Sequence, residues 1–202
     1  MKNIVVLISG SGSNLQALIN AEAKGQLGGR IALVVSNKKA AYGLVRAAEA
    51  NIPTLVRTLK EYKDDGKTRE DYDRDLAAHI EATQAPDLIV LAGWMHILSP
   101  AFIDQFRDKI INLHPALPGE LDGAHAIDRA YEEFKAGIRT RTGIMVHHVI
   151  PEVDKGDPIL TMEIPCVAGD TLETLEERIH TAEHQILPKA VRLVLQHGDN
   201  IL

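Results

Sequence analysis

The stretch of sequence that decides the fold is Ile4-Val5-Val6-Leu7-Ile8-Ser9-Gly10-Ser11-Gly12-Ser13-Asn14. Its first five residues are apolar and mostly β-branched, which predicts a strand covered on both faces, as in a parallel sheet. A glycine-containing turn follows, and Leu15, Leu18 and Ile19 then recur at helical spacing. The order of strand, tight turn and helix predicts the first unit of an α/β sheet.

Short apolar runs recur along the first half of the chain and alternate with helical patterns. Thr68 can cap a helix that carries Tyr72, Leu76 and Ile80 on one face. We therefore expect an α/β fold with an open, mostly parallel, twisted sheet of Rossmann-like type and helices on both faces. Ligands bind such a sheet beyond the carboxyl ends of its strands. The predicted strands cover residues 4–8, 31–35, 54–56, 87–91 and 110–113, and the first helix covers 14–23.

The last third of the chain shows a different pattern. Residues 142–149 and 158–164 predict two strands around a turn at 151–156, so the C-terminal strands are expected to be partly antiparallel. A capping-box pattern that starts at Asp170 predicts a long helix, and Pro188 is expected to kink or break it. The inner side of this helix is expected to carry Leu172, Leu175, Ile179, Ala182, Ile186 and Ala190.

The composition of the chain argues against several classes of protein. The chain of 202 residues carries a net charge of −6, contains 4% aromatic residues and shows no basic stripe, so we expect no nucleic-acid partner. The single cysteine, Cys166, excludes a disulfide framework and a cysteine metal cluster, and its apolar neighbours favour a buried thiol. No apolar run reaches the length of a membrane span or a signal sequence. These features predict a cytoplasmic protein without a membrane partner.

The turn from Ser9 to Asn14 has the features of an anion site. Two glycines permit an oxyanion to approach the backbone, and the following helix offers free N–H groups and the positive end of its dipole. A dinucleotide-binding fingerprint needs a third glycine at position 15, where this chain has Leu15. The loop therefore predicts a phosphate site of another kind, while a glycine-rich turn without a ligand is the simpler alternative.

Asn112 and His114 form the most specific polar pair. They are two residues apart near the end of a predicted strand, so their side chains point to the same face. An amide and an imidazole held there can donate two hydrogen bonds to the oxyanion of an acyl-transfer intermediate. Asp154, in the turn between the last two strands, can supply a carboxylate that accepts a proton. The alternatives are a strand-end pair that satisfies loop backbone and an Asp that only shapes a turn.

Together these motifs resemble the phosphoribosylglycinamide formyltransferase family of folate-dependent enzymes. The resemblance covers essentially the whole chain, and the combination is far more specific than any single motif. The residues that carry it are 4–17, 35–38, 69–73, 91–100, 111–115 and 154–159.

The resemblance implies the activity. It implies direct transfer of the formyl group of 10-formyltetrahydrofolate, a co-substrate, to the amine of glycinamide ribonucleotide in purine biosynthesis, without a metal. It also implies a single domain over residues 1–202, with a phosphate-binding half at 1–100 and a catalytic and folate-binding half at 101–202. The chain is expected to be a monomer or a homodimer.

The resemblance also implies roles for individual residues. The catalytic positions are Asn112, His114 and Asp154. The ribonucleotide positions are Gly12, Ser13, Asn14, His180 and Glu183, although a solvated helix charge is the simpler explanation of Glu183. The folate positions are Arg69, Met95, His96, Ile97, Leu98, Asn112, Ile150, Pro151, Glu152, Val153 and Asp154.

The implied mechanism uses Asn112 and a protonated His114 to stabilise the oxyanion. Asp154 is expected to raise the pKa of His114 and to help move a proton from the attacking amine to the departing nitrogen. Three features depart from the family pattern: a short loop over residues 117–123, Met145 in place of a serine, and His96 in place of an arginine at the rim of the folate pocket.

Four other classes of protein compete with this interpretation. Methionyl-tRNA formyltransferase shares the catalytic pattern but has an added C-terminal RNA-binding domain, and formyl-folate hydrolase carries an extra N-terminal domain. A nucleotide-binding dehydrogenase conflicts with Leu15 in the glycine loop. A ligand-binding module without catalysis is the fourth alternative.

Overall fold

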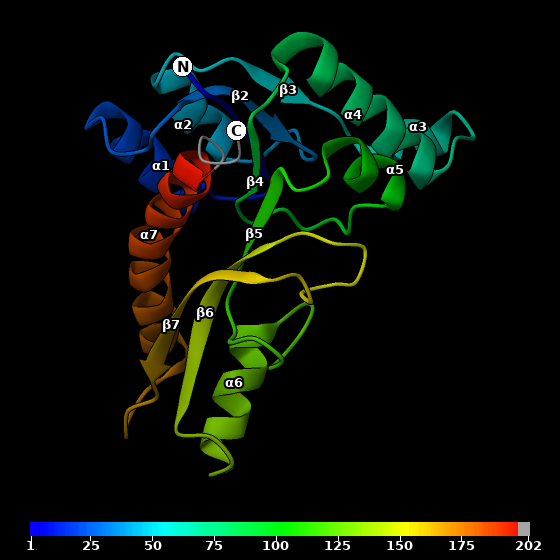
Figure 1. Ribbon diagram of the computed structural model, residues 1–202. Coiled ribbons are helices and arrows are strands. Elements are labelled where there is room, and N and C mark those ends of the chain that lie inside the picture. The colour runs from blue at the N-terminus through cyan, green and yellow to red at the C-terminus, as the bar shows by residue number, and fades with distance from the viewer. Residues whose placement is uncertain (198–202) are drawn as a thin grey trace.

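The strands are β1 (Asn3–Ile8), β2 (Arg30–Ser36), β3 (Thr54–Val56), β4 (Leu88–Leu91), β5 (Ile110–His114), β6 (Arg141–His148) and β7 (Pro158–Pro165). In this computed structural model, which describes residues 1–197, they form one sheet in the order β3-β2-β1-β4-β5-β6-β7 (Figure 1). The first five strands in that order are parallel to one another, and β6 pairs antiparallel with both of its neighbours, β5 and β7. The expected mostly parallel sheet with antiparallel C-terminal strands is confirmed.

The sheet has a topological switch between β1 and β4. From β1 the chain continues outward through β2 and β3, whereas β4 and β5 follow on the other side of β1. The loops after β1 and β4 meet at this point, because the Ser9 amide donates to the Gly93 carbonyl at 3.1 Å and the Met95 amide donates to Ser9 Oγ at 2.9 Å. Such a point is where open α/β sheets bind ligands.

Two hydrophobic cores cover the two faces of the sheet. Ile4, Val6 and Ile8 of β1 belong to one core, and Val5 and Leu7 belong to the other, as the two-residue period of a strand requires. The first core lies beneath α1 (Ser13–Ala23), α2 (Gly43–Glu49), α6 (Ala126–Lys135) and α7 (Leu172–His197). The second lies beneath α3 (Leu59–Asp64), α4 (Arg69–Gln84), α5 (Pro100–Ile103) and the short 3₁₀ helix η1 (Asp104–Phe106).

The helix predicted after Thr68 is α4, and its cap is confirmed. Thr68 Oγ1 accepts a hydrogen bond from the Asp71 amide at 3.1 Å, and the Thr68 amide donates to Asp71 Oδ2 at 2.9 Å. The sequence patterns do not predict α2, α3, α5 or α6. Helices α2, α3 and α5 have only 4 to 7 residues, too few for a hydrophobic period to stand out. The 10 residues of α6 do form an amphipathic pattern, which the sequence argument missed.

The start of α7 corrects one expectation, and its course excludes one of the two outcomes expected at Pro188. Thr171, not Asp170, caps the helix, because Thr171 Oγ1 accepts from the Thr174 amide at 3.3 Å. The Asp170 carboxylate instead accepts from Val167 and from Arg178. The helix also continues through Pro188 without a break. Five of the six predicted inner residues are buried, and the sixth, Leu172, is half-buried.

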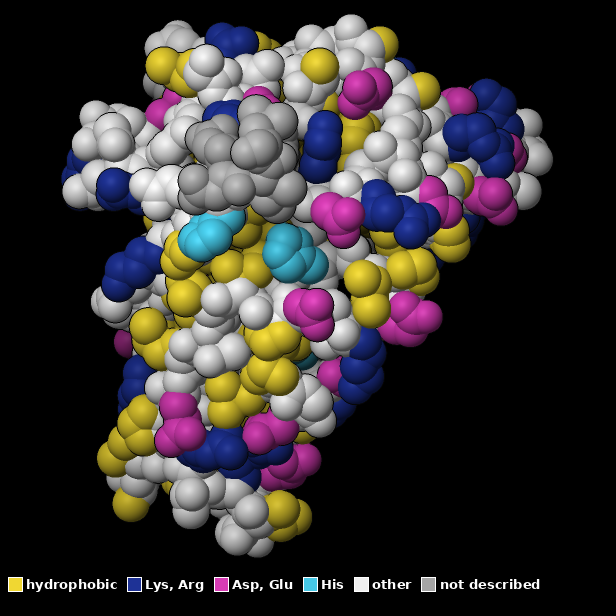
Figure 2. Space-filling model, in the orientation of Figure 1, with side chains coloured by type: hydrophobic (Ala, Val, Ile, Leu, Met, Phe, Trp, Pro, Cys, Tyr) yellow, Lys and Arg dark blue, Asp and Glu magenta, His cyan; other side chains and the backbone are white. Residues whose placement is uncertain are grey.

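Charges of both signs share the surface. On the face shown in Figure 2, Lys and Arg side chains are interspersed with Asp and Glu side chains, with hydrophobic side chains between them. Arg139, for example, pairs with Glu120 at 2.6 Å and with Glu133 at 2.8 Å. Among residues 1–197, no helix has both the length and the apolar character that a membrane crossing needs.

Candidate active site

The glycine loop after β1 presents free backbone donors. Gly12 precedes α1 with a left-handed φ of 72°, and α1 has no side-chain cap and no acidic residue in its first turn. The amides at the start of α1 therefore have no side-chain acceptor, and they lie at the positive end of the helix dipole. The loop is packed against α2, since the Gly43 amide donates to the Gly10 carbonyl at 3.1 Å.

α7 reaches the same loop through a buried carboxylate. Asn14 Nδ2 donates to Glu183 Oε2 at 3.0 Å, although the two residues are 169 positions apart. Glu183 is only 5% exposed, and burial raises the pKa of its carboxyl group. His180, one turn earlier on α7, is exposed. The structure thus brings Gly12, Ser13 and Asn14 together with Glu183, and it excludes the alternative that Glu183 is a solvated helix charge.

The antiparallel pairing of β5 with β6 builds the second part of the site. It places Asn112 opposite His147, and Asn112 Nδ2 lies 3.2 Å from His147 Nε2. Asp154 completes the cluster. Its Oδ1 lies 3.5 Å from Asn112 Nδ2 and 3.5 Å from His147 Nε2, and its Oδ2 lies 3.6 Å from His114 Nδ1. Asn112, His114 and Asp154 therefore converge, as the sequence predicts.

The Asp154 carboxylate is held in its charged form. Burial alone would raise the pKa of Asp154, but the adjacent His147 ring, the Gly123 amide that donates to it at 2.8 Å and the nearby His114 together hold it below its ordinary value. Asp154 has a left-handed φ of 57°. Gly156 lies close to β6, and a Cβ at that position would overlap the His148 carbonyl. Backbone packing thus fixes the turn that carries the acid.

His147 is the residue of this cluster that the sequence argument missed. Its Nδ1 lies 2.8 Å from the His148 carbonyl, which can only accept, so that nitrogen carries a proton. Its Nε2 can then accept a hydrogen bond from Asn112 Nδ2 at 3.2 Å, and it lies 3.5 Å from Asp154 Oδ1. The signal was available in the strand pattern, because an antiparallel neighbour of β5 had to place some residue opposite Asn112.

The protonation of His114 corrects one expectation. Burial lowers the pKa of His114, and the opposing effect of the Asp154 carboxylate does not overcome it. His114 Nε2 lies 3.2 Å from the Leu121 carbonyl, so it carries the proton and donates to that oxygen. The structure therefore favours a neutral His114 before substrate binds, not the charged form that the sequence argument expected.

The short loop over residues 117–123 is tied to this cluster. Arg129 Nη2 donates to the carbonyls of Leu121 and Asp122 at 2.8 and 2.7 Å. Lys155, which follows Asp154 in the chain, pairs with the Asp122 carboxylate. The loop therefore covers His114 through its backbone, not through a side chain.

The segments expected to hold the folate share exposed apolar side chains. Met95, Ile97, Ile150 and Val153 are four of the nine large hydrophobic side chains exposed among the described residues. Arg69 donates to the Ile97 carbonyl, so it lies beside the first of these segments. Pro151 and Glu152 are exposed as well.

Two of the expected folate residues point away from solvent. Leu98 is 4% exposed and belongs to the second core, so only its backbone can face a ligand. The His96 ring stacks on Tyr72 with 5.4 Å between ring centroids and on Trp94 with 5.9 Å. Its position is therefore behind the expected pocket rim rather than on it.

The comparisons with known proteins agree with this geometry. Residues 2–191 match the family model described as formyl transferase. Phosphoribosylglycinamide formyltransferase of Schizosaccharomyces pombe is 51% identical over 201 residues, which cover 96% of this chain and 97% of that protein. The chain belongs to the phosphoribosylglycinamide formyltransferase family. It is a formyl transferase enzyme.

More distant members preserve the fold of this formyltransferase. Escherichia coli phosphoribosylglycinamide formyltransferase is 42% identical over 189 residues, which cover 94% of this chain and 85% of that protein. The crystal structure of glycinamide ribonucleotide transformylase 1 from Symbiobacterium toebii has a TM-score of 0.90 at 37% identity and covers 98% of this chain and 89% of that one.

The buried carboxylate at position 183 makes the stability of this formyltransferase depend on pH. Since burial raises its folded pKa, the folded protein binds the Glu183 proton more tightly than the unfolded chain does. Stability is therefore lost as pH rises from the unfolded pKa towards the folded one. We expect Glu183→Gln, which keeps an acceptor for Asn14, to raise the free energy of unfolding at pH 7 by on the order of 1 kcal/mol.

Urea unfolding of both proteins at pH 4 and pH 7 measures this effect. The gain in the free energy of unfolding should be present at pH 7 and shrink towards pH 4, where the Glu183 carboxyl group is mostly protonated in both the folded and the unfolded protein. An equal gain at both pH values would show that ionisation of Glu183 is not the cause.

The glycine loop yields a second prediction. A Cβ at Gly12 would lie 2.5 Å from Gly43 Cα, and its φ is left-handed, so Gly12→Ala should lower the free energy of unfolding by about 2 kcal/mol. Gly10→Ala is the matched control, because a Cβ there meets nothing within 4 Å. Equal urea midpoints for the two variants would contradict the proposed packing of this loop.

Proposed function

We propose that the enzyme transfers the formyl group of 10-formyltetrahydrofolate to the amine of glycinamide ribonucleotide in purine biosynthesis. Support comes from the relatives, whose names specify a phosphoribosylglycinamide acceptor, and from a chain that matches them over nearly its whole length. One observation carries the proposal: an amide, an imidazole and a carboxylate converge at the carboxyl end of β5.

The acceptor phosphate would bind the amides of Gly12, Ser13 and Asn14. Neighbouring strands lie about 4.8 Å apart, so this loop at the end of β1 is about 10 Å from the cluster at the end of β5. A ribose and a glycyl arm can span that distance. Glu183 and His180 would then contact the ribose and the amine.

The donor would enter from the side of Arg69 and the two exposed apolar segments, 95–98 and 150–154. Apolar side chains such as Met95 and Val153 suit the face of a pteridine ring, and backbone groups next to them suit its polar edge. The guanidinium of Arg69 would pair with the anionic tail of the folate.

In the reaction, the amine nitrogen attacks the formyl carbon, and the bond from that carbon to the tenth nitrogen of the folate breaks. Asn112 Nδ2 and His114 Nε2 would donate to the oxyanion of the tetrahedral intermediate. Both donors now bond to protein acceptors, His147 and the Leu121 carbonyl, which the oxyanion would replace.

The negative oxyanion would favour the charged form of His114, which is neutral before substrate binds and would take the added proton on Nδ1 from solvent. Nδ1 of the charged ring then donates to Asp154. Asp154 is ionised and would help move the proton shed by the amine to the departing folate nitrogen, directly or through one water. No covalent enzyme intermediate is required.

We expect His114→Ala and Asp154→Asn each to lower kcat by roughly 100-fold to 10,000-fold, because each removes a group that acts in the transition state. The assay mixes the protein with formyl-folate and glycinamide ribonucleotide and follows deformylated folate by absorbance. Asp157→Asn is the matched control, since Asp157 is an exposed acid in the same segment. Near-normal turnover of either catalytic variant at neutral pH would refute the assignment.

A further inference from the structure

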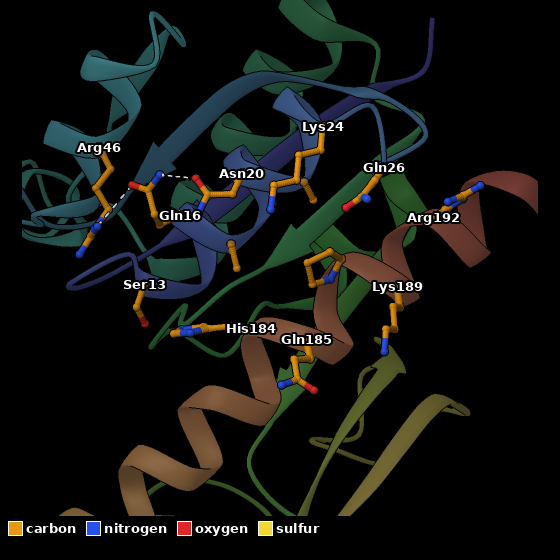
Figure 3. Close-up of a pocket in the computed structure, with 13 residues that line it drawn as sticks. Ser13, Gln16, Asn20, Lys24, Gln26, Arg46, His184, Gln185, Lys189 and Arg192 are labelled. Carbon is orange, nitrogen blue, oxygen red and sulfur yellow. Dashed lines mark hydrogen bonds between the residues drawn. The ribbon is translucent and has the colours of Figure 1, made fainter.

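A pocket of about 810 Å³ lies between α1 and α7, outside the cluster around Asp154 (Figure 3). It begins at Ser13, where the glycine loop enters α1, and extends to Lys24 and Gln26 beyond the other end of that helix. The 11 residues of α1 span about 16 Å at 1.5 Å per residue, so the pocket is elongated.

The charged side chains that line this pocket are all cationic. Lys24, Arg46, Lys189 and Arg192 contribute positive charge, and none of the described lining residues is Asp or Glu. This is unexpected in a protein with a net charge of −6. Within residues 1–197, moreover, Lys24, Lys189 and Arg192 form no ion pair, whereas other basic residues on this protein do.

The cations are spread along the pocket rather than gathered at one point. In Figure 3, Arg46 and Ser13 lie at one end, and Lys24 and Arg192 lie towards the other. Arg46 is fixed in place, because its Nε donates to the Ser11 carbonyl at 2.8 Å and its Nη1 to Gln16 at 3.3 Å. A single carboxylate or phosphate could meet the cations of one end only.

The remaining polar side chains are neutral. Gln16, Asn20 and Gln185 offer amide donors and acceptors. His184 Nε2 has no hydrogen-bond partner within the described structure, and burial, together with His180 and Arg46, lowers the pKa of its ring. Such groups suit hydroxyls and a base edge, and they add no negative charge that would oppose an anion.

We propose that this pocket binds an elongated polyphosphate ligand, with its phosphate chain extending along Lys24, Lys189 and Arg192. The length of the pocket, its unpaired cations and its neutral amides together favour this class over a compact anion. Inorganic polyphosphate and nucleoside triphosphates share the chemistry. The ligand would lie beside the glycine loop, because Ser13 borders both sites.

Isothermal titration calorimetry with ATP and with inorganic tripolyphosphate, both without metal and at low salt, tests the proposal. The Lys189→Gln/Arg192→Gln variant should weaken binding at least tenfold, since it removes two charge-assisted contacts. Arg107→Gln/Lys135→Gln is the matched control, because it removes the same two charges from exposed positions outside the pocket.

Each result of these titrations either supports or overturns the proposal. Equal binding of ATP and tripolyphosphate would identify the phosphate chain as the recognised part, and tighter binding of ATP would add the nucleoside. Absence of binding, or an equal loss in the pocket variant and the control, would overturn the proposal. Because calorimetry needs no formyl transfer, failure here is distinguishable from failure of the proposed function.

Discussion

The active site depends on the register between β5 and the antiparallel strand β6. That register sets His147 opposite Asn112, and the turn that leaves β6 then returns Asp154 to the same point. A shift of β6 by one residue would turn His147 to the other face of the sheet and displace the turn that carries Asp154. The antiparallel pairing of β5 with β6, at one end of the sheet, therefore brings Asn112, His147 and Asp154 together.

Burial decides which member of the cluster carries charge before the reaction. His114 and Asp154 are both largely buried, yet their pKa values fall for different reasons. Burial itself lowers the pKa of the imidazole, whereas the adjacent His147 ring and the Gly123 amide overcome the opposite effect of burial on the carboxylate. The free enzyme thus holds a neutral donor next to an anionic acceptor, a combination suited to a reaction in which negative charge appears only in the intermediate.

The sequence could predict the parts of this enzyme that repeat a local pattern. Apolar runs such as residues 4–8 give strands because both faces must be buried, and Thr68 gives a helix start because its hydroxyl can cap. The pairing of Asn14 with Glu183 could not be predicted in this way, since it joins residues 169 positions apart. The charge on His114 was misjudged because burial depends on the assembled fold. The cap at Thr171 was missed because Arg178 occupies Asp170.

The contact made by Gly156 bears on how the enzyme could be redesigned. The position of Asp154 depends on a close main-chain contact between this glycine and the end of β6, where any side chain would collide. The neighbouring side chains of Pro151, Glu152 and Val153 are exposed and take no part in that contact. Their side chains can therefore be changed to suit another donor, while the position of Asp154, set by a single residue without a side chain, is kept.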